Sequence, residues 1–356
     1  MFDIFYKLPA LHSLGIHIHL HCFSYGRSPQ PGLERYCHSV HYYPRRKTVS
    51  LFLPYIVASR RSKALFANLL KDDHPILMEG IHCSYPLFDK RFAHRALYLR
   101  LHNTEYVYYR HLFSHTSRPF HKLYYFAESL LLKHYEKQVA KKARPIWAMS
   151  GTDVDLYQNV LHATSITYLP LFIPPWQVAG SEGYGTFCLY QGNLSVEENE
   201  QAVLWLISHV FASLTVPFVI AGKNPTRRLA KAVQSHSHIQ LQANPSATEM
   251  DKLISNAHIH ILPSFNATGI KIKLVHALFS GRHCIVNTAA VAGTPLHPLC
   301  HIADTAADMQ AAIARLFQTP FTAADIQQRQ QLLNKEFSNE AGAQYIRQQL
   351  QLIQKG

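Results

Sequence analysis

The stretch ILPSFNATGIKIKLVHALFSGRHCIVN, Ile261 to Asn287, contains a helix between two apolar strands. The run Ile259–Leu262 predicts a buried strand, which a Pro-Ser turn and a glycine-led loop connect to the helix. Gly281 marks the end of that helix, and Cys284–Val286 predicts the next strand. A strand, a helix and a strand in this order indicate an α/β domain with a parallel sheet.

Two lysines, Lys271 and Lys273, lie in the first turn of this helix, directly after Gly269. A helix N-terminus attracts anions through its unpaired N–H groups and the helix dipole, and lysine there is slightly unfavourable for stability. Placing two lysines at this point therefore predicts a phosphate site. The alternative is an ordinary helix with two solvated lysines.

The composition sets the class of protein. With 356 residues, 47% hydrophobic and 16% charged, the chain has room for two folded domains and is not disordered. The net charge of +13 is uneven: residues 1–180 hold 22 Lys and Arg against 11 Asp and Glu, and the remainder holds 13 against 11. A basic first half predicts an acidic partner such as an anionic membrane surface. Nucleic acid is not expected, because no nucleic-acid-binding motif accompanies the charge.

The six cysteines form no CxxC pair and lie mostly in apolar stretches, so we expect reduced core thiols. The alternating HIHLH of residues 17–21 fits one face of a strand better than a zinc site. The sequence has neither 18 consecutive apolar residues nor a signal peptide. These features predict a cytoplasmic protein that does not span a membrane.

Strands and helices alternate in both halves of the chain, and the Pro- and Gly-rich residues 164–186 interrupt the pattern. We therefore predict an α/β domain over residues 1–170, a second over 171–320, and C-terminal helices over 321–356. Two such domains would face each other across a cleft, because ligands of open α/β sheets bind at the carboxyl ends of the strands.

Three loops of the second half follow strands and are rich in Gly, Asn and Ser: GNLS (192–195), GKNP (222–225) and PSFNATG (263–269). Such residues let backbone N–H groups approach a polyanion. None of the three is a GxGxxG fingerprint or a P-loop, which argues against hydride transfer to NAD and Walker-type ATP hydrolysis.

On these residues the chain resembles the bacterial GT-B glycosyltransferases, in the retaining group that uses nucleotide sugars (glycosyl transferases group 1). The second half resembles their donor-binding domain through GNLSVEENEQAVLWL, AGKNP and the stretch quoted first. The first half resembles their acceptor domain through MEGIHCSY, YLRLHNTEYVYY, ESLLLKHYEKQ and WAMSGTD. The resemblance implies two Rossmann-like domains.

The resemblance also implies donor-binding residues. Gly269, Ile270, Lys271 and Lys273 match the family segment whose basic residues face the donor diphosphate. Fixed cations there would stabilise the leaving nucleoside diphosphate without a metal or other cofactor.

Further donor contacts are implied at Gly192 and Asn193, beside the transferred sugar and phosphate. Lys223 or Arg228 would add positive charge at the diphosphate. Many family members hold two glutamates eight positions apart across the signature helix. Thr268 and His276 occupy those positions here, so both carboxylates are missing, although His276 can still hydrogen-bond a ribose hydroxyl.

On the acceptor side, His102, Asn103 and Glu105 match a strand end of the family, and Glu79 follows the preceding strand. We predict His102 as the polar group at the reacting sugar, with catalytic roles shared by His102, Lys271 and Lys273. The family usually begins with a strand and a glycine-rich loop, whereas Met1 here enters a helix directly. We therefore expect the first domain to lack its N-terminal strand, through a start upstream of Met1 or a truncated gene.

The predicted function is transfer of a sugar from a nucleotide-sugar donor to a glycan or lipid-linked acceptor in cell-surface polysaccharide synthesis. We expect a cytoplasmic enzyme, with the basic first half contacting the inner membrane face through segments such as Arg45–Lys47 and Arg60–Lys63. Two alternatives stay open: a GT-B nucleotide-sugar epimerase, and a non-catalytic remnant that binds sugar nucleotides.

Overall fold

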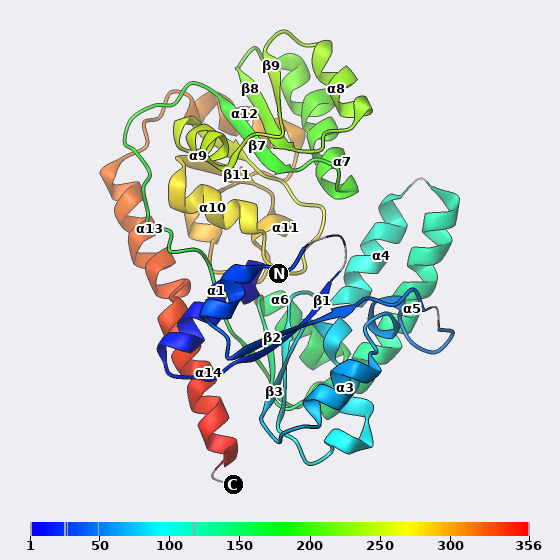
Figure 1. Cartoon of the computed structure of the whole chain (residues 1–356). Coiled ribbons are helices and arrows are strands. Elements are labelled where there is room, and N and C mark those ends of the chain that lie inside the picture. The colour runs from blue at the N-terminus through cyan, green and yellow to red at the C-terminus, as the bar shows by residue number, and fades with distance from the viewer. Residues whose placement is uncertain (1, 25, 27, 49, 117, 355–356) are drawn as a thin grey trace. The chain divides into compact units, whose positions relative to one another are not determined.

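The computed structural model describes residues 2–354 except 25, 27, 49 and 117. The chain divides into two compact units (Figure 1): unit 1 comprises Met1–Pro174 and Phe337–Gly356, and unit 2 comprises Pro175–Glu336. The boundary lies four residues beyond the predicted end of the first domain at residue 170. Residues 321–356 are shared between the units, with one long helix in each.

Unit 1 contains two parallel sheets. Its strands are β1 (His19–Ser24), β2 (Ser39–Pro44), β3 (Ile76–Glu79), β4 (Leu97–Leu101), β5 (Ile146–Ala148) and β6 (Ile166–Tyr168). Its α-helices are α1 (Phe2–Ser13), α2 (Tyr55–Ala58), α3 (Lys63–Leu69), α4 (Glu105–His115), α5 (Pro119–Lys142), α6 (Gly151–Asp155) and α14 (Asn339–Gln354). Short helical turns occupy Pro31–Arg35, Ile81–Cys83, Tyr85–Phe88, Lys90–Phe92 and Leu156–Val160.

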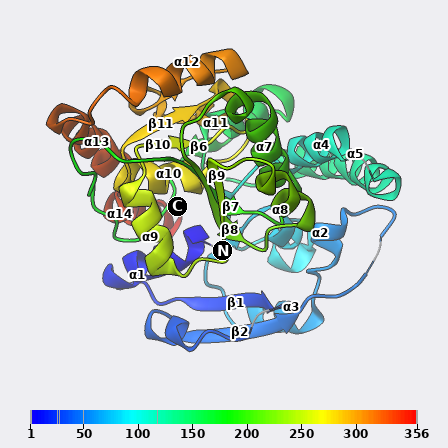
Figure 2. The same ribbon diagram turned by 90° about the horizontal axis from the view of Figure 1, so that it is seen from above.

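The strand order in one sheet of unit 1 is β3-β4-β5-β6. The other sheet contains only β1 and β2, which lie side by side in Figure 2. The strand predicted from the alternating residues 17–21 begins at His19, and β2 was not predicted. The histidines of β1 lie in the strand that their alternation predicts. Across the described residues, no three histidines of this region bring ring nitrogens within metal-binding range of one another.

Alternate residues of the four-stranded sheet enter two cores. On one face, Leu99 and Ile146 pack with α5 residues such as Leu132. On the other face, Tyr98 and Trp147 stack at 5.3 Å and pack with α1 and α14. A parallel sheet buried on both sides is the arrangement that strand–helix alternation predicts.

Unit 2 contains one six-stranded sheet. Its strands are β7 (Cys188–Asn193), β8 (Phe218–Lys223), β9 (Ile239–Ala243), β10 (Ile259–Ile261), β11 (His283–Val286) and β12 (His301–Ile302). Its α-helices are α7 (Glu197–Trp205), α8 (Arg227–Gln234), α9 (Ala247–Asn256), α10 (Ile272–Ser280), α11 (Thr288–Val291), α12 (Ala306–Leu316) and α13 (Ala323–Glu336). Short helical turns occupy Leu206–Val210, Phe211–Ser213 and His297–Leu299.

The strands of unit 2 are parallel in the order β12-β11-β10-β7-β8-β9, the doubly wound Rossmann order. Its topological switch point lies where β7 pairs with β10, at Cys188 with Ile259. Ligands of such sheets bind outside the carboxyl ends of the strands at this point. The loops that follow β7 and β10 are the ones that the sequence analysis selected. Within the described residues, no helix combines the length and apolarity needed to cross a membrane.

Candidate donor site and acceptor-side polar network

The loop between β10 and α10 is held by its own side chains. Ser264 and Asn287 exchange two hydrogen bonds, with Ser264 N donating to Asn287 Oδ1 (2.9 Å) and Asn287 Nδ2 donating to Ser264 O (2.7 Å). Asn266 Oδ1 accepts from both N and Oγ1 of Thr268 (2.9 and 2.8 Å). Gly269 then adopts a left-handed φ of 66°. The structure thus places Thr268 inside the loop, where its buried hydroxyl shapes the approach to α10.

Lys273 lies at the switch point of the sheet. Its Nζ donates to Tyr190 Oη of β7 (2.8 Å) and to Asn199 Oδ1 of α7 (2.9 Å). Burial lowers the pKa of Lys273 to about 8, although the charge of Glu198 opposes that shift. Both direct partners of the ammonium are neutral groups, so the lysine is a half-buried cation without a carboxylate in contact among the described residues.

Lys271 is the N-cap residue of α10, and its Nζ donates to Thr268 O (2.7 Å). The N-cap side chain makes no capping hydrogen bond to this helix. The first N–H groups of an uncapped helix are available to an anion. Ile270, half-buried, connects Gly269 to this position. The predicted pair of lysines therefore lies at an uncapped helix start.

The loop after β7 adds polar groups beside Lys273. Asn193 Oδ1 accepts from N and Oγ of Ser195 (3.2 and 2.9 Å), and Asn193 O accepts from Asn199 Nδ2 (3.0 Å). Asn199 thus contacts both Asn193 and Lys273. The exposed Lys223 pairs with Asn193 in the sheet, one position beyond Gly192 paired with Gly222. Asn199 lies within the motif GNLSVEENEQAVLWL but is not among the predicted site residues.

His276 has different neighbours. Its ring stacks on Trp176 at 4.4 Å, and its Nε2 lies 3.6 Å from Asp251 Oδ1 on α9. Burial lowers the pKa of His276, and Asp251 partly opposes that shift. None of these contacts joins His276 to Lys271 or Lys273.

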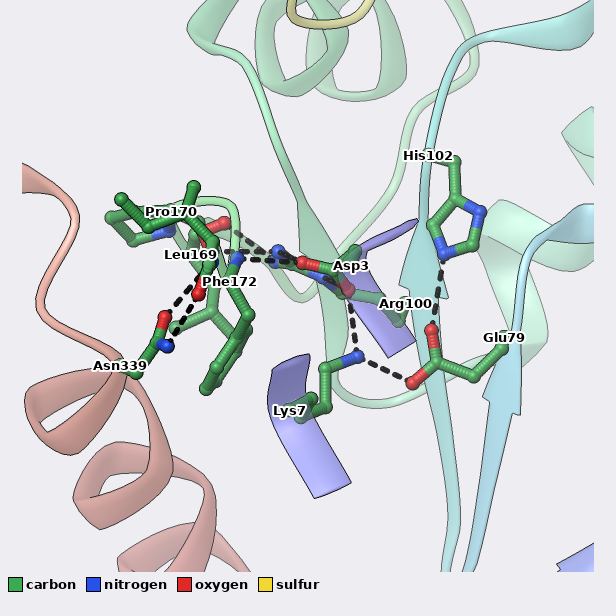
Figure 3. A network of polar contacts seen from close by, with 10 residues as sticks. Asp3, Lys7, Glu79, Arg100, His102, Leu169, Pro170, Phe172 and Asn339 are labelled. Atoms are coloured by element: carbon green, nitrogen blue, oxygen red, sulfur yellow. Dashed lines mark hydrogen bonds and ion pairs between the residues drawn. The ribbon is translucent and has the colours of Figure 1, made fainter. Parts of the chain in front are cut away.

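In unit 1, the predicted residues His102 and Glu79 meet at the carboxyl ends of β4 and β3 (Figure 3). His102 Nε2 lies 3.0 Å from Glu79 Oε2, and Lys7 Nζ donates to Glu79 Oε1 at 2.5 Å. Lys7 also forms an ion pair with Asp3 Oδ2 at 2.9 Å. Despite its burial, the pKa of Glu79 is lowered by Lys7 and by His102.

Arg100 completes this network from within β4. It donates to Asp3 Oδ1 (3.2 Å) and to the carbonyl oxygens of Leu169 and Pro170 (2.5 and 2.7 Å). Phe172 N donates to the same Asp3 oxygen at 2.8 Å. Burial alone would raise the pKa of Asp3, but Lys7 and Arg100 outweigh it and lower that pKa well below its usual range. The network fixes α1 against the sheet and the chain that follows β6.

The sequence analysis missed Asp3, Lys7 and Arg100. Asp3 and Lys7 stand four residues apart on an otherwise apolar helix face, and Arg100 interrupts the apolar run of β4. Charged side chains in such positions are buried only when they are paired, so the sequence could have predicted ion pairs among these three residues.

The other predicted acceptor-side residues lie near the start of α4. Asn103 Oδ1 is buried without a hydrogen-bond partner among the described residues. Burial, together with Asp153, raises the pKa of Glu105 to about 7. The carboxylate of Glu136 accepts from the backbone N–H groups of Glu105 and Tyr106 (3.0 and 2.9 Å) and thereby caps α4. No hydrogen bond or ion pair described here joins Glu105 to His102.

Two features could suggest a metal. Ligand atoms of Asp3, Glu79 and His102 lie within 4.8 Å of one another, but the Lys7 ammonium bonds to both carboxylates and supplies the positive charge there. Asp153 and Asp155 have the Asp-x-Asp spacing typical of metal-dependent GT-A transferases. The Asp153 carboxylate, however, accepts hydrogen bonds from Thr104 N and Oγ1 and from Ser150 Oγ, so it links the chain after β4 to the start of α6.

No model of a known protein family matches the sequence. A relative from Klebsiella pneumoniae is 27% identical over 282 residues, covering 74% of this chain and 71% of the relative. It is described as an uncharacterized 44.6 kDa protein in the cps region.

Several solved structures share the fold. The structure of Anabaena HepE, determined with UDP and glucose, aligns with 94% of this chain and all of its own at a TM-score of 0.62 and 9% identity. TarM aligns with a TM-score of 0.61 and 11% identity over 78% of this chain, which spans only 55% of TarM. The structure of the pneumococcal O-GlcNAc transferase GtfA, determined with UDP and GlcNAc, aligns at a TM-score of 0.56 and 14% identity. The alignment covers 82% of this chain and 60% of GtfA. The chain therefore has the GT-B fold of glycosyltransferases, built from two Rossmann-like domains.

Proposed function

We propose that this protein is a metal-independent glycosyltransferase of the hexosyltransferase type. It transfers a sugar from a nucleotide sugar to a glycan or lipid-linked acceptor on the cytoplasmic side of the membrane. The observation that carries the proposal is Lys273, a half-buried ammonium with two neutral partners at the switch point of a Rossmann sheet. The cps-region relative supports a role in cell-surface polysaccharide synthesis.

The donor diphosphate would bind at the start of α10. A nucleoside diphosphate supplies the anion that Lys273 lacks, and Lys271 with the uncapped N–H groups adds further positive potential. When the bond between the anomeric carbon and the diphosphate oxygen breaks, negative charge develops on the leaving diphosphate. Fixed cations at that place stabilise the transition state more than the ground state. Gly192 and Asn193 would lie beside the transferred sugar and phosphate, and Lys223 would add positive charge at the diphosphate.

On the acceptor side, Glu79 would orient His102. When Nε2 donates to Glu79, the other ring nitrogen, Nδ1, is an acceptor. Nδ1 can then accept a hydrogen bond from a sugar hydroxyl, which is the role predicted for His102 at the reacting sugar. Asn103, with its buried unpaired Oδ1, would offer a second acceptor from the same strand end.

The experiment is a panel of nucleotide sugars, beginning with UDP-glucose and UDP-GlcNAc because UDP accompanies HepE and GtfA. We expect one donor to raise the melting temperature and to release its nucleoside diphosphate when acceptor is supplied. The Lys271→Gln variant should weaken donor binding while circular dichroism stays unchanged, and Lys252→Gln, an exposed lysine of α9, is the matched control.

Other outcomes would replace the proposal. Absence of stabilisation by every donor would overturn it. Stabilisation with interconversion of the donor sugar and no transfer would assign an epimerase. Stabilisation with neither reaction, across a panel of glycan and lipid-linked acceptors, would assign a binding protein.

A further inference from the structure

Large apolar side chains are exposed on α5 and on the loop that precedes α2. The exposed fractions are 89% for Phe120, 69% for Leu123 and 55% for Leu130 on the helix, and 83% for Leu51 and 86% for Phe52 on the loop. Tyr124 and Phe126 are also exposed. We call these seven residues the α5 apolar surface.

The helix residues of this surface lie on the side of α5 that unit 1 leaves uncovered. Residues three or seven positions apart, such as Leu123 with Phe120 and Leu130, share one helix face. The opposite side is packed: Leu132 and Val139 are buried in the core of unit 1. Figure 1 shows α4 and α5 side by side, and Phe113 of α4 contacts Phe126 at a ring distance of 5.3 Å.

The loop is attached to the same helix. Tyr55 N donates to both carboxylate oxygens of Glu128 on α5, at 3.0 and 2.9 Å. Ser50 Oγ accepts from Phe52 N and Leu53 N, at 3.2 and 3.1 Å. The exposed side chains of the loop are therefore held beside α5 by an ordered turn.

Every exposed charged side chain of α5 is basic. The two acidic residues of the helix, Glu128 and Glu136, are buried and bound to backbone N–H groups. The exposed basic residues on or next to the helix are Arg118, Lys122, Lys133, Lys137, Lys141 and Lys142, and Arg46 and Lys47 precede the loop. Apolar side chains occupy the N-terminal half of α5, and lysines dominate its C-terminal half.

This combination selects a lipid bilayer over a protein partner. Protein interfaces are depleted in lysine, whereas all five exposed basic residues of α5 are lysines. At a bilayer, aromatic and leucine side chains enter the headgroup region while lysines stay with anionic headgroups. We propose that the α5 apolar surface and its lysines bind an anionic phospholipid bilayer as a peripheral contact.

This contact leaves out Arg60–Lys63, one of the two basic segments predicted from the sequence to contact the membrane. Arg61 lies over the ring of Tyr85 at 4.2 Å, and Arg60 Nη1 donates to Ile56 O at 2.7 Å. These guanidinium groups are used within unit 1. The contact goes beyond the proposed transfer reaction, because no donor-site residue takes part in it.

The test is flotation of the purified protein with vesicles of phosphatidylcholine alone or mixed three to one with phosphatidylglycerol. We expect binding to the anionic vesicles only, and weaker binding as salt is raised. Replacing Phe120 and Leu123 by Ser should weaken partition at least about tenfold. Replacing Lys133 and Lys137 by Gln should weaken it roughly twentyfold.

Matched control residues lie in unit 2. Tyr184→Ser removes another exposed aromatic side chain, and Lys252→Gln with Lys335→Gln removes two exposed lysines. These variants should bind vesicles as the unchanged protein does, and so should Lys271→Gln, which separates lipid binding from donor binding. Equal losses in the controls, binding to neutral vesicles, or no binding at all would overturn the proposal. A dimer in solution that only the α5 variants dissociate would assign the surface to a second copy.

Discussion

His102 Nε2 lies 3.0 Å from Oε2 of Glu79, and the two residues come from the neighbouring parallel strands β4 and β3. If this pair acts at the reacting sugar, replacing His102 by Ala should lower kcat by about a hundredfold or more. Glu79→Gln should lower kcat by a smaller factor, because the imidazole remains but loses its orienting carboxylate. Donor binding should be unchanged in both variants, and initial rates with saturating donor measure the effect.

Unit 1 supplies its own control for this prediction. His94 Nε2 lies 3.1 Å from Asp73 Oδ1, which makes a second histidine–carboxylate pair, but both side chains are exposed. His94→Ala should leave kcat unchanged. A similar loss in His94→Ala and His102→Ala would contradict the assigned role.

Asp3 should stabilise unit 1 strongly at neutral pH. Removing one partner of a buried ion network leaves the others unpaired, so Asp3→Asn should lower the free energy of unfolding by about 3 kcal/mol at pH 7. The folded pKa of Asp3 is lowered, so its stabilisation is present above the unfolded pKa. It is lost as pH falls below about 4 toward the folded pKa.

Urea unfolding of unit 1 can measure this dependence through Trp147 fluorescence, in a background where Trp176 and Trp205 are replaced by Phe. The gap between the unchanged protein and Asp3→Asn should narrow from pH 7 to pH 3. A constant gap would show that the Asp3 carboxylate acts by packing alone.

The fold was largely predictable because its signals are local. Strand–helix alternation predicted the parallel sheets, and the stretch around Gly269 and Gly281 predicted β10, α10 and β11 within two residues. The loops at the switch point followed from their position after strands. The strand β2, Ser39–Pro44, was missed, although its valine and two tyrosines favour a strand.

The polar contacts of the site were less predictable, because they join residues far apart in sequence. Lys7 and Glu79 are separated by 72 positions, and Lys273 and Tyr190 by 83. No local pattern selects such partners. Thr268 and His276 were selected only through their alignment with family glutamates, and the structure assigns them contacts with Asn266 and with Trp176.

Gly222 should be irreplaceable in β8. A Cβ at this position would lie 1.8 Å from Gly192 O, and backbone atoms of a paired strand cannot move aside. We expect Gly222→Ala to destabilise unit 2 by at least about 3 kcal/mol, measured by chemical denaturation. Gly32→Ala is the control, because a Cβ at that position meets no atom within 4 Å. The free energy of unfolding of this variant should equal that of the unchanged protein.

Lys273 gives the donor-site proposal a pH signature. Burial lowers its pKa to about 8, and a bound diphosphate favours the ammonium form, so binding must raise that pKa again. Above pH 8 the lysine of the free protein loses its proton, and binding must restore it. The affinity for UDP should therefore fall about tenfold between pH 7 and pH 9, whereas the diphosphate itself is already mostly ionised at pH 7.

Isothermal titration with UDP measures both the affinity and the proton uptake, the latter from buffers of different ionisation enthalpy. Lys273→Met removes the titrating group, so its weaker affinity should no longer depend on pH in this range. Should that variant fail to fold, proton uptake by the unchanged protein at pH 8.5 still tests the prediction. Lys252→Met should keep the pH dependence, because its exposed ammonium belongs to α9. An affinity that is equal at pH 7 and pH 9 without proton uptake would place the diphosphate away from Lys273.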